Sequence, residues 1–190
     1  KMSIKETPMP IPPTIVATAR MGWNWQWKQL MNGLAPADNK GNYLRPTSRY
    51  QNSVILSKAN LEARSKEQLP RLIVGRSCPW AHRTWLIFKL RGLAKNLSLL
   101  IVQADHKAGL WKLDKPWMGC HSLLELYQRC GSPSSMRATV PALIDPGNNK
   151  NLKPVLLGNE SAQLIETLNG WPTYEDAPNL APQSLQAEIK

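Results

Sequence analysis

The feature that most constrains this chain is the stretch from Arg71 to Leu93, where a short apolar run is followed at once by a helical pattern. Leu72 to Val74 predicts a buried strand, Gly75 to Ser77 predicts a turn, and the apolar spacing that follows predicts a helix. Cys78 lies where the strand gives way to the helix, and Pro79 suits the first helical position. The sequence therefore places a cysteine at the N-terminus of a helix.

A thiol at this position faces unpaired backbone N–H groups and the positive end of the helix dipole. Both favour thiolate over thiol, and the thiolate is the form of cysteine that acts as a nucleophile. Three nearby basic residues add positive charge: Arg76, His82 and Arg83. We therefore predict that Cys78 is a reactive thiol, and that Cys120 and Cys130, which lack this context, are buried structural cysteines.

The fourth position of the motif indicates how such a thiol would work. The run reads Cys78-Pro79-Trp80-Ala81, so it lacks the second cysteine of a dithiol Cys-x-x-Cys motif. A single thiol that forms a mixed disulfide needs an external thiol to resolve it. Glutathione is the obvious intracellular candidate for that thiol.

Composition narrows the class of protein. The 190 residues suffice for one compact domain and a sizeable extension, and no apolar run approaches the roughly 18 residues that span a bilayer. Three widely spaced cysteines and three unpaired histidines predict a reducing compartment, cytoplasm or organelle stroma, and no metal. The net charge of +11 is scattered along the chain. We therefore expect a solvated basic surface that attracts anionic small molecules, and no nucleic acid.

The first 70 residues are predicted to be an N-terminal extension. Residues 1 to about 20 are rich in proline and predict an extended arm. A helix should follow, with an apolar stripe of Trp23, Trp27, Leu30, Met31 and Leu34. Its polar face carries only Lys28, so docking onto the body of the protein or onto a partner is favoured over a membrane surface. Residues 35–70 predict a long, irregular approach to the first strand.

From residue 71 the pattern becomes regular. The predicted elements are listed in chain order: strand 72–74, helix from 79, strand 97–102, loop 103–120, helix 121–130, strands 139–145 and 154–157, and helix 162–168. This β–α–β–α–β–β–α order is that of a thioredoxin-like α/β domain. We assign residues 71–170 to that domain and residues 171–190 to a linker.

Three runs in this domain resemble a known family: Ser77 to Thr84, Arg137 to Pro141, and Asn159 to Ser161. They look like the glutathionyl-hydroquinone reductases, also called xi-class glutathione transferases. Upstream, residues 34–36 and 42–46 resemble the N-terminal extension of that family, so the likeness runs from about residue 22 to the end. The family pairs the thioredoxin-like domain with an all-helical domain, which would follow Lys190 and is missing from this chain.

The resemblance implies glutathione-dependent reduction of glutathionyl-hydroquinones, with glutathione as co-substrate and aromatic quinol conjugates as partners. Cys78 would attack the glutathionyl sulfur and form a mixed disulfide, which a second glutathione would resolve. Val140, before a cis Pro141, would pair with the cysteinyl backbone of glutathione, and Glu160 with Ser161 would hold its γ-glutamyl end. Trp111 and Arg137 match family positions that contact glutathione.

Each implied role has a plainer alternative. Trp111 is explained equally by packing, Arg137 by a solvated surface charge, and Glu160 with Ser161 by a helix cap. A homodimer formed through the missing helical domain and docking to another protein both stay open. The second hypothesis for the whole chain is a non-catalytic binding or assembly module of glutathione-transferase type that docks to a larger complex.

Overall fold

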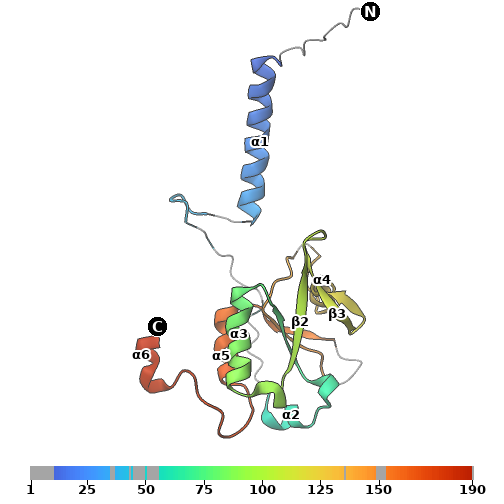
Figure 1. The fold of residues 1–190 in the computed structure, drawn as a ribbon, viewed down its shortest axis with the longest axis vertical. Helices are drawn as coiled ribbons and strands as arrows, with labels where there is room; N and C mark the ends of the chain where they lie inside the picture. Colours follow the sequence, from blue (N-terminus) through green and yellow to red (C-terminus); the bar gives the residue numbers. More distant parts are fainter. Residues whose placement is uncertain are drawn as a thin grey trace, which may run out of the picture. The chain divides into compact units, whose positions relative to one another are not determined.

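The computed structural model of the protein describes residues 11–34, 37–42, 44, 50, 56–134, 136–148 and 153–189. The chain forms two compact units, Lys1–Thr47 and Ser48–Lys190. The first contains α1 (Pro13–Leu34), a single helix of 22 residues (Figure 1). The helix predicted after residue 22 is therefore confirmed. The extended arm is wrong for residues 13–20, because a proline at the first helical position, here Pro13, is compatible with a helix.

The second unit contains the predicted strands and helices in the predicted order, together with additional elements. Its elements are α2 (Lys58–Glu62), η1 (Lys66–Gln68), β1 (Arg71–Gly75), α3 (Pro79–Leu90), η2 (Leu93–Lys95), β2 (Ser98–Asp105), β3 (Leu110–Trp117), β4 (Cys120–Ser122), α4 (Leu123–Arg129), β5 (Ala142–Asp145), β6 (Val155–Gly158), α5 (Ser161–Asn169), η3 (Gln183–Leu185) and α6 (Gln186–Ile189). This is the thioredoxin-like α/β fold that the sequence predicts, with β3 and β4 added. None of the helices in the described ranges is long and apolar enough to cross a membrane.

Strand β1 lies inside a six-stranded sheet of order β4-β3-β2-β1-β5-β6. It pairs in parallel with β2 and antiparallel with β5. Helices α3 and α5 lie side by side against the sheet, and α4 contacts β3 and β4 (Figure 1). Because an inner strand covered on both faces contacts no water, its residues can be apolar without alternation, which explains the run Leu72 to Val74.

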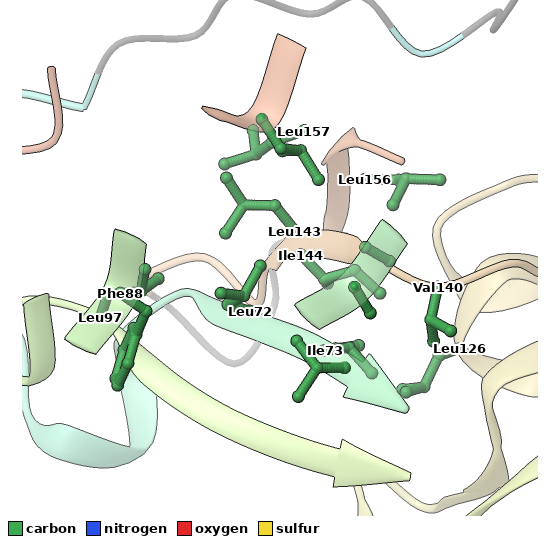
Figure 2. Close-up of a cluster of buried hydrophobic side chains, with 14 of the residues drawn as sticks. Leu72, Ile73, Phe88, Leu97, Leu126, Val140, Leu143, Ile144, Leu156 and Leu157 are labelled. Carbon is green, nitrogen blue, oxygen red and sulfur yellow. The ribbon is translucent and has the colours of Figure 1, made fainter. Parts of the chain in front are cut away.

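One hydrophobic core holds these layers together. Figure 2 shows a cluster of its buried side chains, contributed by β1, β5, β6, α3 and α4. Leu72, Ile73, Leu143 and Ile144, from the paired strands β1 and β5, are fully buried. Burying side chains of this size contributes about 1.5–3 kcal/mol each relative to leaving them exposed. The core therefore fixes the position at which β1 ends and α3 begins.

The loop predicted over residues 103–120 is wrong. Instead, β2 continues to Asp105 and turns back into β3, which pairs antiparallel with it. The Asp105 carboxylate accepts hydrogen bonds from the backbone N–H groups of Lys107 and Ala108, and Gly109 adopts φ +67° at the end of the turn. An aspartate followed by a glycine in this way is a turn signal. Pro116 and a register irregularity in β3 interrupt the alternation of apolar and polar side chains by which a strand is predicted from sequence.

The irregular approach predicted for residues 35–70 is wrong for its last part, which contains α2 and η1. This segment is tied to the sheet by Arg64, whose guanidinium contacts the Asp145 carboxylate through two hydrogen bonds. The Arg64 and Asp145 side chains are only 5% and 11% exposed. Leu61 of α2 also lies in the core. The predicted division at residues 70 and 170 into extension, domain and linker stays a prediction.

Replacing Arg64 with methionine should lower the free energy of unfolding by about 3 kcal/mol, because it leaves the buried Asp145 carboxylate without its partner. Chemical denaturation followed by tryptophan fluorescence measures this change. Lys58→Met is the matched control, since the Lys58–Glu175 ion pair is exposed and such pairs contribute about 0–1 kcal/mol. Equal effects of the two substitutions would contradict the prediction.

Candidate active site

Cys78 is the N-cap residue of α3, as the sequence predicts. Its backbone is extended, with φ −99° and ψ 113°, and Pro79 opens the helix. Its amide N donates to the Gly75 carbonyl at 3.1 Å, and its own carbonyl accepts from the His82 amide at 3.0 Å. These bonds close the turn on one side and begin the helix on the other. The half-buried thiol is thereby held at the helix N-terminus, and its catalytic role stays a prediction.

The sheet brings the other predicted segments to the end where Cys78 lies. Since β1 and β5 are antiparallel, with Ile73 opposite Ala142, the start of β5 lies beside the end of β1. Strand β6 returns antiparallel to β5, with Gly158 opposite Leu143, so the residues after β6 emerge at the same end. The parallel pairing of β1 with β2 brings the start of β3 there as well. Residues separated by up to about half the chain thus meet through strand direction alone.

The contact between Cys78 and Val140 is direct. The Cys78 Sγ lies 3.5 Å from the Val140 carbonyl oxygen, to which the thiol donates a hydrogen bond. The Val140–Pro141 peptide bond is cis, as expected. Tyr127 of α4, which the sequence analysis did not single out, donates its hydroxyl to the Thr139 carbonyl at 2.8 Å. Tyr127 therefore anchors the backbone immediately before Val140.

Glu160 and Ser161 lie at the N-terminus of α5. Glu160 is the N-cap residue and is half-buried, but its side chain makes no capping hydrogen bond. Ser161 is the first helical residue and is 2% exposed, and among the described residues its Oγ has no hydrogen-bond partner. A role in helix capping alone therefore does not explain the buried Ser161 hydroxyl. A buried hydroxyl without a protein partner is uncommon, and it can donate a hydrogen bond to a bound molecule or accept one from it.

Trp111 packs on the turn that carries Cys78. A Cβ placed on Gly75 would lie 2.5 Å from Cζ3 of the Trp111 ring, so the ring covers the Gly75 backbone three residues before Cys78. Only glycine allows this approach, and the sequence pattern gives no sign of it beyond the glycine itself. Packing therefore accounts for Trp111 without a ligand. Arg137 is exposed, three residues before Val140, and its predicted contact with glutathione stays a prediction.

An open hollow of about 470 Å³ lies beside Cys78, and Val140 is not among the residues that line it. Its walls come only from the turn and the exposed side of α3: Arg76, Ser77, Cys78, Pro79, His82, Arg83 and Leu86. The other predicted site residues do not line it. Cys78 therefore takes part in two surroundings, the cis-proline segment and this basic hollow. No group of metal-ligating side chains occurs within the described residues.

Cys120 and Cys130 differ from Cys78 in their environment. Burial raises the pKa of the Cys120 thiol. Burial, followed by the neighbouring Cys120, raises the pKa of the Cys130 thiol to about 12. Both groups therefore stay protonated near neutral pH, which supports their prediction as structural cysteines.

The family model described as "Glutathione S-transferase, N-terminal domain" matches residues 77–170, which include the Cys78 turn, the cis-proline segment and the start of α5. Residues 77–170 thus resemble the N-terminal domain of the glutathione S-transferases, and we call them the transferase domain. This match begins at the turn before Cys78 and ends at Gly170, the C-cap residue of α5.

Two curated proteins resemble the transferase domain and its surroundings. Glutathione S-transferase omega-like 2 of Schizosaccharomyces pombe is 33% identical over 131 residues, which cover 62% of this chain and 40% of that protein. Glutathionyl-hydroquinone reductase YqjG of Escherichia coli is 33% identical over 106 residues, which cover 52% of this chain and 31% of that protein. The chain thus spans less than half the length of these relatives.

Two solved structures support the same assignment. The glutathione-bound structure of YqjG matches with a TM-score of 0.51 and 32% identity, over 63% of this chain and 41% of that one. The glutathione transferase Xi of Phanerochaete chrysosporium matches in fold, with a TM-score of 0.63 and 23% identity, over 80% of this chain and 51% of that one. The predicted resemblance to the xi class and to glutathionyl-hydroquinone reductases is confirmed.

Brief treatment of the folded protein with iodoacetamide at pH 7.5 should label Cys78 and spare the other two cysteines. Cys78 lines an open hollow, whereas a raised pKa keeps Cys120 and Cys130 in the unreactive thiol form. Labelling of Cys130 should increase only as the pH rises toward 12, because its thiolate forms there. Peptide mass spectrometry gives the site of labelling. Unfolding in urea is the control, and it should make all three cysteines reactive; preferential labelling of Cys130 in the folded protein would contradict the prediction.

Gly75→Ala should lower the free energy of unfolding by about 1–3 kcal/mol, because the new methyl group overlaps the Trp111 ring. In a Trp111→Ala background the same substitution should have little effect, and a double-mutant cycle by chemical denaturation measures the difference. Gly170→Ala is the control, since a Cβ there meets nothing closer than 3.8 Å. An equal loss in both backgrounds would show that Trp111 is not the obstacle.

Proposed function

We propose that this chain is a glutathione-dependent monothiol reductase of glutathionyl-hydroquinones. The observation that carries the proposal is the position of Cys78 at the N-terminus of α3, with its sulfur against the carbonyl of Val140 in the cis-proline segment. The match to the transferase domain and the likeness to YqjG support it. All three cysteines are free, which suits the reducing compartment, cytoplasm or organelle stroma, in which glutathione acts.

In the first step Cys78, as thiolate, attacks the sulfur that joins glutathione to the aromatic ring. An S–S bond forms and the aryl C–S bond breaks, its electron pair passing to the ring carbon, which takes up a proton. The hydroquinone leaves reduced by two electrons, and Cys78 is left in a mixed disulfide with glutathione. The thiolate is the form of cysteine that attacks, and Cys78 presents its sulfur at the N-terminus of α3.

In the second step a free glutathione resolves the mixed disulfide. Its thiolate attacks the disulfide, which releases oxidised glutathione and returns Cys78 as thiolate. The chain itself offers no resolving cysteine in the motif, since Ala81 occupies the fourth position. Cys120 and Cys130, whose thiols stay protonated, are unsuited to replace it. An external thiol is therefore part of the proposed cycle.

Glutathione would bind along the cis-proline segment and the start of α5. The Val140 backbone would pair with its cysteinyl residue, which sets the thioether sulfur beside Cys78. The partnerless Ser161 hydroxyl and the N–H groups that open α5 suit the γ-glutamyl carboxylate, while Glu160 would hold the ammonium group. Arg137 would approach the same ligand from the segment before Val140. Trp111 would support the turn, because its ring already packs on Gly75.

Cys78→Ser should reduce turnover of glutathionyl-hydroquinone by at least about a thousandfold, because a serine hydroxyl cannot replace the thiolate as nucleophile. Release of hydroquinone, measured by chromatography in the presence of glutathione, gives the rate. Mixing the wild-type chain with the conjugate, without free glutathione, should leave one glutathione on Cys78, which mass spectrometry of the tryptic peptides detects.

Cys130→Ser is the matched control and should retain most of the activity, since that thiol is half-buried and protonated. A folded wild-type chain that neither releases hydroquinone nor acquires glutathione on Cys78 would exclude the reductase and favour the binding module. Activity that persists in Cys78→Ser would show that another residue is the nucleophile.

A further inference from the structure

The hollow beside Cys78 carries a cluster of basic side chains, Arg76, His82 and Arg83, which we call the basic cluster. All three are exposed, and none has an ion pair or hydrogen bond from its side chain within the part of the chain that the structure describes. Two other arginines of this unit are engaged: Arg64 with a carboxylate and Arg91 with three backbone carbonyls. The basic cluster is thus charge available to a ligand.

Among the described residues the lining of the hollow contains no carboxylate, although Arg83 also lines a second pocket that contains Glu166. Besides the basic cluster and Cys78 the lining of the hollow consists of Ser77, Pro79 and Leu86, of which Leu86 is 50% exposed and offers an apolar contact. The guanidinium groups of Arg76 and Arg83 are charged at any working pH and bind carboxylates through paired hydrogen bonds. A planar, anionic aromatic group therefore matches the hollow in charge and in character.

The hollow also includes the nucleophile in its lining. The Cys78 sulfur contacts Val140 in the segment proposed for glutathione, yet neither Val140, Pro141 nor Ser161 lines the hollow. A conjugate joined through its sulfur extends in two directions from Cys78. With its glutathione half along Val140, its aromatic half has this hollow beside the reacting sulfur.

We infer that the basic cluster binds the aromatic half of the conjugate and selects hydroquinones that carry an acidic ring substituent, such as a carboxylate. The inference rests on the proposed reductase function and adds its substrate class. Arg76 and Arg83 contact the carboxylate, and the His82 imidazole donates a hydrogen bond to it or to a ring oxygen. The same charges stabilise the negative charge that moves onto the ring as the C–S bond breaks.

The test compares two glutathionyl-hydroquinones that differ only in a ring carboxylate or a ring carboxamide. The wild-type chain should show kcat/KM about tenfold higher for the carboxylate conjugate, since contacts of this kind at an open site contribute modestly. Arg76→Gln and Arg83→Gln should each reduce that ratio toward one, because turnover of the carboxylate conjugate falls more than turnover of the carboxamide conjugate. The preference should also fall as ionic strength rises.

Arg129→Gln is the matched control, because Arg129 is an exposed arginine of α4 that does not line the hollow. It should leave the ratio unchanged. Equal turnover of the two conjugates by the wild-type chain would overturn the inference and leave the reductase standing. An equal loss for both conjugates in Arg83→Gln would also overturn it, because the basic cluster would then bind the carboxylates of glutathione.

A second readout does not depend on turnover. The basic cluster should raise the rate at which Cys78 reacts with the anion iodoacetate relative to neutral iodoacetamide, compared with the same ratio for free glutathione. Arg83→Gln should lower this ratio severalfold and Arg129→Gln should not. The wild-type chain could reduce neither conjugate and still show the raised iodoacetate-to-iodoacetamide ratio that Arg83→Gln lowers. That result would exclude the reductase function and support the basic cluster as an anion site. If the ratio is that of free glutathione, the anion site itself is excluded.

Discussion

The structure depends on the point at which β1 ends and α3 begins. The core holds β1 between β2 and β5, so its last residues have one position, and the turn from Gly75 to Cys78 starts from it. The hydrogen bond between the Cys78 amide and the Gly75 carbonyl makes Cys78 the N-cap of the helix. A side chain that is placed by the backbone in this way needs no further support to lie at the positive end of the helix dipole.

Close packing around this turn explains why small substitutions in it should destabilise the protein. Trp111 lies over Gly75 from β3, and Tyr127 holds the Thr139 carbonyl from α4, so the two segments that flank Cys78 are each fixed by one large aromatic residue. Both aromatic residues come from the part of the chain between β2 and β5. The edge of the sheet thereby supports the proposed reaction centre even though it contributes no reacting group.

The two surroundings of Cys78 suggest that the two halves of the ligand bind to different surfaces. The cis-proline segment and the start of α5 offer backbone groups and a partnerless hydroxyl, which suit a peptide-like molecule. The hollow offers guanidinium and imidazole groups with one exposed leucine, which suit a charged aromatic molecule. The sulfur lies where these surfaces meet, which is the position that cleavage of a bond between the two kinds of molecule requires.

The sequence by itself determined the fold class, the strand–turn–helix around Cys78 and the absence of a resolving cysteine, because each of these depends on local spacing. It also marked the Val140–Pro141 bond, although only through a family resemblance. It did not reveal the β3–β4 pair, since Pro116 breaks the alternation, or the early start of α1 at Pro13. Only the tertiary structure decided that Trp111 packs on Gly75 and that Tyr127 holds Thr139. These are contacts between distant segments, and their residues meet because of strand order and direction, which no local pattern of side chains specifies.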